Sequence, residues 1–218
     1  TMVNVNNDFG QALSAGMKEA GPKLGLQLVS EYNFGMGDRQ FGSIVASVKK
    51  DDPEVIYVSG YFFNGGPLVA QLRAGGVTAP IVGTEGFDTV NFVQIAKEAA
   101  EGVIITTSLD RDTTDPVMRK FIEDYKKRFS VGAEMVAAST HTAVNVLAEA
   151  IRKVGIDDPA KLRDAIAATK SMPSAVGTIT FNNSREVYKA AQIQVIKGGE
   201  FKRFAVIDDP VLLAPPTY

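Results

Sequence analysis

The chain of 218 residues carries 23 basic against 25 acidic residues, which gives a net charge of −2. No basic stripe interrupts this balance, so nucleic acid is not expected as a partner, and no apolar run approaches the length of a membrane span. The sequence has no cysteine and one histidine, His141, which excludes disulfides, thiolate nucleophiles and a two-histidine metal site. We therefore expect a soluble globular protein that uses no metal and no cofactor.

Strand and helix patterns alternate through the first half of the chain. Residues 3–6 predict the end of a strand, and Asp8 with Gln11 predicts a capping box at the start of the next helix. Asp38 is the predicted N-cap of a second helix. The other expected elements are strands over 26–32, 55–59, 81–83 and 103–107 and helices over 38–50, 66–74 and 116–129. This alternation predicts an α/β fold with a parallel sheet covered on both faces.

The second half of the chain opens with two predicted helices, which we call the return helices. A long helix is expected over 134–154, and a second begins at Asp158-Pro159 and ends near residue 168. The apolar positions of the long helix are Val136, Val144, Leu147, Ala150 and Ile151. This apolar stripe needs cover from another part of a protein.

The C-terminal region reads as strands. Residues 178–181 predict one strand, and two more over 188–196 and 201–207 are joined through Gly198-Gly199, which is a strong hairpin signal. Residues 210–218 contain three prolines and predict an irregular tail.

Candidate binding residues follow the predicted parallel strands, where ligands of open α/β sheets bind. Phe9 follows the first strand, Tyr61 and Phe62 follow the third, and Glu85 and Phe87 follow the fourth. A carboxylate beside aromatic rings suits a cationic ammonium group. The charge-assisted hydrogen bond contributes about 1.5–3 kcal/mol, and the ring faces add roughly 0.5–2 kcal/mol.

Each of these side chains also has a purely structural interpretation. Tyr61 would then cover the sheet edge, Glu85 would be a solvated loop acid, and Phe9, Phe62 and Phe87 would belong to the core or its rim. The glycines form no phosphate loop, because none lies in the strand–GxGxxG–helix context that gives the motif its meaning.

Four phrases carry a family resemblance by their order and spacing. They are Asn7-Asp8-Phe9-Gly10, Val58-Ser59-Gly60-Tyr61, Gly83-Thr84-Glu85-Gly86 and Ala100-Glu101-Gly102-Val103. To about Ile207 the chain resembles the leucine/isoleucine/valine-binding family of transporter solute-binding proteins, the type I periplasmic binding proteins. The resemblance implies a flavodoxin-like lobe in which Tyr61 and Glu85 match a tyrosine and a glutamate that hold the ligand's ammonium group. Phe9 matches an aromatic position of the cleft wall, but it lacks the hydroxyl of the tyrosine often found there.

The resemblance also implies that the chain is a fragment. Residues 1–136 match the second lobe, residues 137–187 would belong to the first lobe, and residues 188–218 form the crossover hairpin and tail. The Ser/Thr loop of the first lobe, which grips the ligand carboxylate, has no counterpart here. In the long helix, His141-Thr142 replaces the family's usual Tyr-Asp. We expect the return helices to pack on the remaining lobe or on a second copy of the chain, as a homodimer.

The expected function is therefore that of the solute-binding component of an ABC-type uptake system. Its ligand would be a branched-chain or related amino acid, its partner a membrane permease, and its location periplasmic, or extracellular and lipid-anchored. Residues 1–5 show no signal peptide, so a cytosolic protein or a removed leader are both compatible with them.

Two alternatives remain open at this point. One is a cytosolic regulator that senses amides or amino acids with the same fold. The other is an enzyme that uses Glu85 and Asp110 as acid and base, although the sequence offers no plausible nucleophile–base pair.

Overall fold

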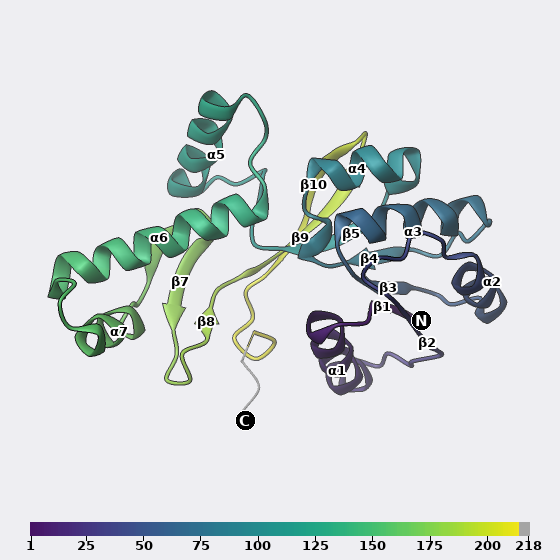
Figure 1. Ribbon diagram of the computed structural model, residues 1–218, viewed down its shortest axis with the longest axis horizontal. Coiled ribbons are helices and arrows are strands. Elements are labelled where there is room, and N and C mark those ends of the chain that lie inside the picture. The colour runs from purple at the N-terminus through teal and green to yellow at the C-terminus, as the bar shows by residue number, and fades with distance from the viewer. Residues whose placement is uncertain (214–218) are drawn as a thin grey trace. The chain divides into compact units, whose positions relative to one another are not determined.

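The computed structural model describes residues 1–213 and shows two compact units. Unit 1 contains residues 1–106 and 194–202, and unit 2 contains residues 107–193 with 203–213 of the described chain. The chain therefore passes between the units three times (Figure 1). The first passage lies thirty residues before the lobe boundary expected at residue 136, and the assignment of these parts to lobes of a larger protein stays a prediction. Residues 214–218 of the predicted tail lie outside the described residues.

A seven-stranded sheet with the order β10-β9-β5-β4-β3-β1-β2 forms the centre of unit 1. Its first five strands are β1 (Met2–Val5), β2 (Glu31–Phe34), β3 (Ile56–Ser59), β4 (Ile81–Gly83) and β5 (Ile104–Thr107), all paired in parallel. The predicted hairpin, β9 (Ala191–Lys197) and β10 (Glu200–Ile207), extends the sheet beyond β5. The predicted open parallel sheet is therefore confirmed.

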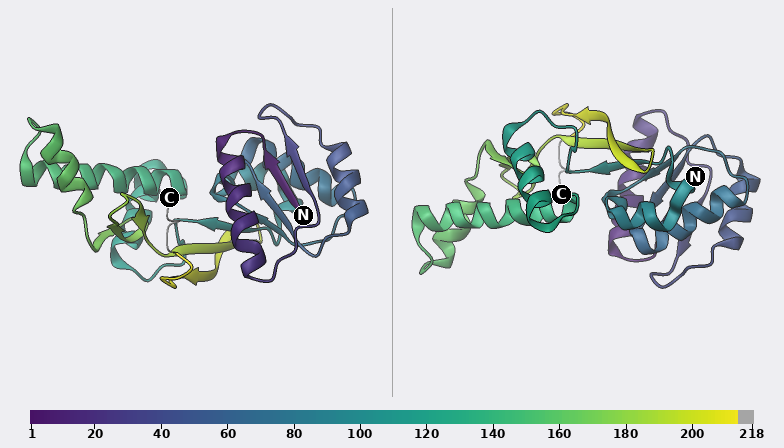
Figure 2. Two further views of the ribbon diagram at one scale, coloured as in Figure 1. Left: turned by 90° about the horizontal axis from the view of Figure 1, so that it is seen from below. Right: turned by 90° about the horizontal axis from the view of Figure 1, so that it is seen from above.

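The helices of unit 1 cover both faces of this sheet. They are α1 (Asp8–Lys23), α2 (Gly42–Asp51), α3 (Phe62–Ala74) and α4 (Val90–Ala96). Figure 2 shows α1 in front of the sheet in one view and α3 and α4 in front of it in the opposite view. Right-handed crossovers produce this division, because the connection from β1 to β2 runs in the opposite direction along the sheet from those that follow. No helix among residues 1–213 is long and apolar enough to cross a membrane.

Two predicted helix caps are wrong. The N-cap of α1 is Asn7 rather than Asp8, and its side-chain oxygen accepts a hydrogen bond of 2.9 Å from the backbone N–H of Gly10. Asp38 does not cap α2, which begins four residues later. Its carboxylate instead accepts a hydrogen bond of 2.7 Å from the N–H of Gly35 and closes the turn between them. Asn and Asp are almost equally good caps and turn residues, so local pattern did not separate these roles.

The start of α3 also differs from the expectation, because the helix begins at Phe62 instead of residue 66. The side chain of Asn64 accepts a hydrogen bond of 2.9 Å from the N–H of Tyr61, which stabilises the earlier start. Gly65 and Gly66 belong to the helix, where they permit close packing. An added Cβ would lie 2.0 Å from the ring of Phe87 at residue 65 and 2.7 Å from Ile95 at residue 66.

Unit 2 contains three helices and a small antiparallel sheet within its described residues. The helices are α5 (Pro116–Phe129), α6 (Met135–Val154) and α7 (Pro159–Ala167), and the strands are β6 (Met172–Ser174), β7 (Gly177–Phe181) and β8 (Val187–Tyr188). Asp115 and Asp158 cap α5 and α7, as their Asp-Pro sequences indicate. The sequence did not predict β6 and β8, because each is only two or three residues long.

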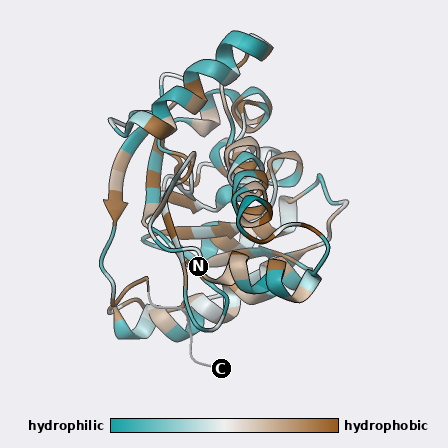
Figure 3. Ribbon diagram, turned by 90° about the vertical axis from the view of Figure 1, so that its left-hand side faces the viewer, coloured by the Kyte–Doolittle hydropathy of each residue, from teal (hydrophilic) through white to brown (hydrophobic). Residues whose placement is uncertain are grey.

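The long helix α6 buries a different face from the predicted one. Its buried positions are Ala138, Thr142, Val146 and Ala150, which recur every four residues. Of the predicted apolar stripe, Ala150 is buried, whereas Val136 and Val144 are 66% and 59% exposed. Hydrophobic and hydrophilic residues are interleaved along the helices (Figure 3). Val136, Val144 and Leu147 of α6 therefore remain exposed in this chain, whereas Val146 is buried.

Candidate functional site

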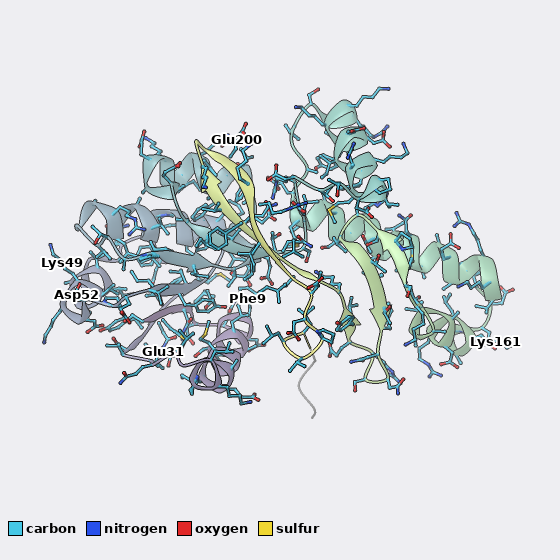
Figure 4. All side chains as sticks on the ribbon, turned by 180° about the vertical axis from the view of Figure 1, so that it is seen from behind. Phe9, Glu31, Lys49, Asp52, Lys161 and Glu200 are labelled. Atoms are coloured by element: carbon cyan, nitrogen blue, oxygen red, sulfur yellow. The ribbon has the colours of Figure 1, made fainter. Side chains whose placement is uncertain are left out.

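The candidate site lies in unit 1 at the carboxyl ends of β1, β3 and β4. Asn4 of β1 is level with Ser59 of β3, and Val58 is level with Gly83 of β4. The loops that follow these strands therefore leave the sheet from adjacent positions at the same edge. Phe9, labelled in Figure 4, extends from the first turn of α1 at the end of the β1 loop.

A row of aromatic rings forms the centre of this edge. The ring of Tyr61 lies between those of Phe9 and Phe63, with centroid distances of 5.3 Å and 5.6 Å and interplanar angles of 27° and 7°. The side-chain amide of Asn7 donates a hydrogen bond of 3.4 Å to the Tyr61 hydroxyl. All three rings are half-buried, so each keeps accessible surface. Stacked rings of this kind present polarisable faces in a fixed orientation.

The two other predicted phenylalanines have different positions. Phe62 packs edge-on against Phe63, with 5.3 Å between centroids, and is partly buried against the core. Phe87 is fully buried and stacks on Phe92 at 4.4 Å. A ligand at this edge cannot touch the Phe87 ring, so the structure does not support its predicted role as a binding residue. Phe87 supports the site from beneath, as a core side chain.

Phe63, which follows the third strand with Tyr61 and Phe62, was expected at this edge but not chosen as a binding residue, and Asn7 was not predicted to bind. Both belong to the aromatic row and its hydrogen bond. The early start of α3 explains the first omission. It places Tyr61 at the N-cap and Phe63 in the first turn, whereas a loop would have left the direction of the ring open.

Glu85 begins a 3₁₀ turn, Glu85–Phe87, directly after β4 and is half-buried. The structure gives its carboxylate no hydrogen bond and no ion pair with any residue in 1–213. The loop is pressed against the neighbouring one, since a Cβ added at Gly86 would lie 2.1 Å from the carbonyl oxygen of Gly60 and 3.2 Å from the Cα of Tyr61. This backbone contact places the Glu85 turn beside Tyr61, as predicted from the strand order.

Tyr57 of β3 interacts electrostatically with Glu85, although its side chain lines an apolar groove away from the carboxyl edge. Burial, and to a lesser degree the charge of the Glu85 carboxylate, raises the pKa of Tyr57 to about 12. Tyr57 therefore stays protonated at neutral pH and remains a hydrogen-bond donor. The edge combines an unpartnered acid with aromatic rings, which is the chemistry for holding a cationic group beside an apolar one.

Asp110, the second acid of the enzymatic alternative, lies in unit 2 and is engaged in an ion pair. Its carboxylate is 5% exposed and accepts hydrogen bonds from Nε of Arg203, at 2.9 Å, and from Nη2. The same guanidinium donates to the carbonyl oxygen of Asp112 at 2.9 Å. A carboxylate held in this way stabilises the fold and is a poor general base.

No group of three or more His, Asp or Glu side chains in the described part of the chain is arranged to hold a metal ion. An apolar groove of about 440 Å³ lies elsewhere in unit 1, against α1 and the beginnings of β1 and β3, where Met2, Met17 and Leu28 line it. It offers a ligand little directional chemistry and is not at the carboxyl edge of the sheet.

Comparison with known proteins gives consistent matches. The family described as "Periplasmic binding protein" matches residues 1–200. "Leu/Ile/Val-binding protein homolog 3" of Brucella melitensis is 29% identical over 180 residues, which are 82% of this chain and 48% of that protein. The chain thus spans about half the length of the curated relatives it matches, as expected for a fragment.

Solved structures agree with the fold. A leucine binding protein of Thermotoga maritima superposes with a TM-score of 0.88 at 27% identity, over 95% of this chain and 60% of that one. A branched-chain amino acid transporter substrate binding protein of Streptococcus pneumoniae, crystallised with isoleucine, gives 0.83 at 23% identity, over 94% and 58%. These matches confirm the predicted resemblance and the lobe fold.

Proposed function

Because the chain belongs to the periplasmic binding protein family, we propose that unit 1 forms one wall of a binding site for a branched-chain or related amino acid. The observation that carries this proposal is the Glu85 carboxylate, which has no hydrogen bond or ion pair in the described chain and belongs to a turn whose backbone lies against the Tyr61 loop. The names of the relatives support the ligand class. They are names of binding proteins, and we propose that this chain also acts by binding and not by catalysis.

Each side chain of the edge has a role in this proposal. Glu85 accepts hydrogen bonds from the ligand's ammonium group, and the row of Phe9, Tyr61 and Phe63 presents its accessible ring surface beside the same charge. Phe9 and Phe63 flank Tyr61 and limit its rotation. The side-chain amide of Asn7 fixes the Tyr61 hydroxyl by donating a hydrogen bond to it. Phe62 contributes only to the rim.

The complete protein would supply what unit 1 lacks. Since the chain spans about half of its curated relatives, we propose that a first lobe provides the groups for the ligand's carboxylate. Closure of the two lobes around the ligand would be the working motion. The same proposal includes an ABC-type permease as partner and a periplasmic location, or an extracellular one with a lipid anchor.

Binding to the isolated chain is testable by NMR. Titration with leucine, isoleucine and valine at millimolar concentrations is expected to shift the amide signals of residues 7–9, 60–63 and 85–87, while those of α6 stay unchanged. With only half of the site present, we expect weak binding. Calorimetry that gave micromolar or tighter binding by this chain would contradict the need for a second wall.

Glu85→Gln tests the ammonium site. In a two-lobe protein that contains this chain, we expect the substitution to lower leucine affinity about 10- to 100-fold, because the amide loses a charge-assisted hydrogen bond of about 1.5–3 kcal/mol. Calorimetry measures the effect. The matched control is Glu54→Gln, which changes an exposed glutamate ahead of β3 and is expected to have no effect. An unchanged affinity in Glu85→Gln would remove the proposed role of this carboxylate.

The exposed side chains of α6 lead to a separate proposal. Val136, Val144 and Leu147 would be covered by the first lobe in a complete protein and by a second copy of the chain in its absence. Light scattering of the 218-residue chain is then expected to show a dimer, and Val144→Glu to dissociate it. A monodisperse monomer of the unsubstituted chain would refute the dimer.

A further inference from the structure

A network of polar side chains, buried at Asn4, Ser14 and Ser59, lies beneath α1 in unit 1. Ser59 Oγ donates to Asn4 Oδ1 at 2.8 Å, and Asn4 Nδ2 donates to Glu31 Oε1 at 3.0 Å. Ser14 Oγ donates to the same carboxylate oxygen at 2.5 Å, and Lys18 Nζ pairs with Glu31 Oε2 at 2.5 Å. Asn4 and Ser59 are 1% and 0% exposed. Figure 4 labels Glu31 on the α1 side of the sheet.

This network is unusual for its position, because the covered face of a parallel sheet is normally apolar. Buried polar groups are tolerated only where they are hydrogen-bonded, and a partly satisfied network is costly. Here the amide of Asn4 is satisfied at both ends, by Ser59 on one side and Glu31 on the other. The carboxylate fixes the direction of the whole chain of bonds, since an ionised carboxylate can only accept.

Several contacts keep Glu31 ionised. The hydrogen bond from Lys18 and then that from Ser14 hold the pKa of the Glu31 carboxyl below its usual value, against the opposing effect of burial. These contacts favour the ionised form of Glu31, which is the form that accepts the hydrogen bonds of the network. It determines that the Asn4 amide presents its oxygen to Ser59.

The same carboxylate is bonded directly to α1 and to β1, and through Asn4 it is linked to β3, the strand that precedes Tyr61. It holds α1 through Ser14 and Lys18, and α1 carries Phe9 in its first turn. It also holds β1 through Asn4, and through Asn4 it reaches Ser59, two residues before Tyr61. The stack of Phe9 on Tyr61 therefore joins two elements whose positions depend on one common anchor.

We propose that Glu31 is a positioning residue for the binding edge: it orients Asn4, which fixes Ser59 and so sets the position of Tyr61 relative to Asn7 and Phe9. Its functional importance rests on the proposed amino-acid site, but its structural effect does not. Glu31 touches no ligand in this proposal. It acts through the hydrogen bonds that it accepts from Asn4 of β1 and Ser14 of α1.

The test uses the ligand-free 218-residue chain and follows the side-chain amide signal of Asn7 and the ring signals of Tyr61 by NMR. Glu31→Ala is expected to shift and broaden both signals, because Asn4 and Ser14 lose their acceptor. Glu31→Gln keeps an acceptor oxygen for both donors and is expected to restore signals close to those of the unsubstituted chain. Lys18→Met removes only the ion pair and is expected to leave them in place.

The control for general destabilisation is Val48→Ala, which opens a cavity in the fully buried core under α2. It is expected to leave the Asn7 and Tyr61 signals unchanged. The proposal is overturned if Glu31→Ala does not move these signals, if Glu31→Gln does not restore them, or if Val48→Ala moves them equally. Since no ligand is present, these outcomes are independent of whether the edge binds an amino acid.

Discussion

Replacing Phe87 with alanine is expected to lower the free energy of unfolding of unit 1 by about 3–5 kcal/mol. The ring is fully buried, stacks on Phe92 at 4.4 Å, and occupies the space that Gly65 leaves by having no Cβ. The ring lies against α3 at Gly65 and against α4 at Phe92, so the cavity left by alanine can close only if α3 moves. Hydrogen exchange of the β3 and β4 amides measures the loss for unit 1 alone.

Phe63→Ala provides the comparison, because Phe63 belongs to the same aromatic group but is only half-buried. Its loss is expected to cost about 1 kcal/mol, near the centre of the usual range for single substitutions. In a two-lobe protein it should weaken leucine binding, since Phe63 flanks Tyr61. Equal costs for the two substitutions would show that Phe87 is not a core residue in solution.

The contrast between these two rings shows where sequence reasoning about the site reached its limit. Short apolar runs predict the strands, and strands joined by one strand–helix–strand unit usually lie side by side. The adjacency of the Tyr61 and Glu85 loops could therefore be predicted. Which aromatic side chains face the edge could not. That depends on the start of α3 at residue 62, which the hydrogen bond between Asn64 and Tyr61 stabilises, and on the 3₁₀ turn after β4.

The glycines of α3 illustrate the same limit for the fold. Gly65-Gly66 reads locally as a loop or a helix boundary, and the predicted helix therefore started too late. The two glycines instead lie inside the helix, where their lack of a Cβ leaves room for the ring of Phe87 and the side chain of Ile95. Both of these residues lie twenty or more positions further along the chain. Caps that depend on one adjacent proline, at Asp115 and Asp158, were predicted correctly because their cause is local.

The prediction of which face of α6 is buried failed for a different reason. Hydropathy favours Val136, Val144 and Leu147 as the buried stripe, but the helix buries Ala138, Thr142, Val146 and Ala150 instead. Ala138 and Val146 belong to the apolar cluster of unit 2 that also contains Val176 and Ile179. Val136, Val144 and Leu147 stay exposed in a chain that spans about half of its relatives, and a sequence pattern does not say which partner covers a face.

Replacing Gly86 with alanine is the second substitution for which we expect a large effect, of about 3 kcal/mol in the stability of unit 1. The added Cβ would lie 2.1 Å from the carbonyl oxygen of Gly60, and neither atom belongs to a flexible side chain. The Glu85 turn and the Tyr61 loop must therefore separate until these atoms reach van der Waals contact. Hydrogen exchange measures the stability, and the NMR titration with leucine measures the site.

The separation of the loops matters more for binding than for folding. In the proposed site the Glu85 carboxylate and the Tyr61 ring must reach one ammonium group together, and hydrogen bonds weaken steeply when their geometry is disturbed. Gly86→Ala is therefore expected to abolish the leucine-dependent shifts at residues 60–63 and 85–87, even where most of the chain remains folded.

The control is Gly16→Ala on the exposed face of α1, where nothing lies within 4 Å of the added Cβ. It is expected to stabilise the helix by about 0.5–1 kcal/mol and to leave the shifts intact. If Gly86→Ala retained them, the backbone contact between the two loops would not be what brings Glu85 and Tyr61 to the same ligand.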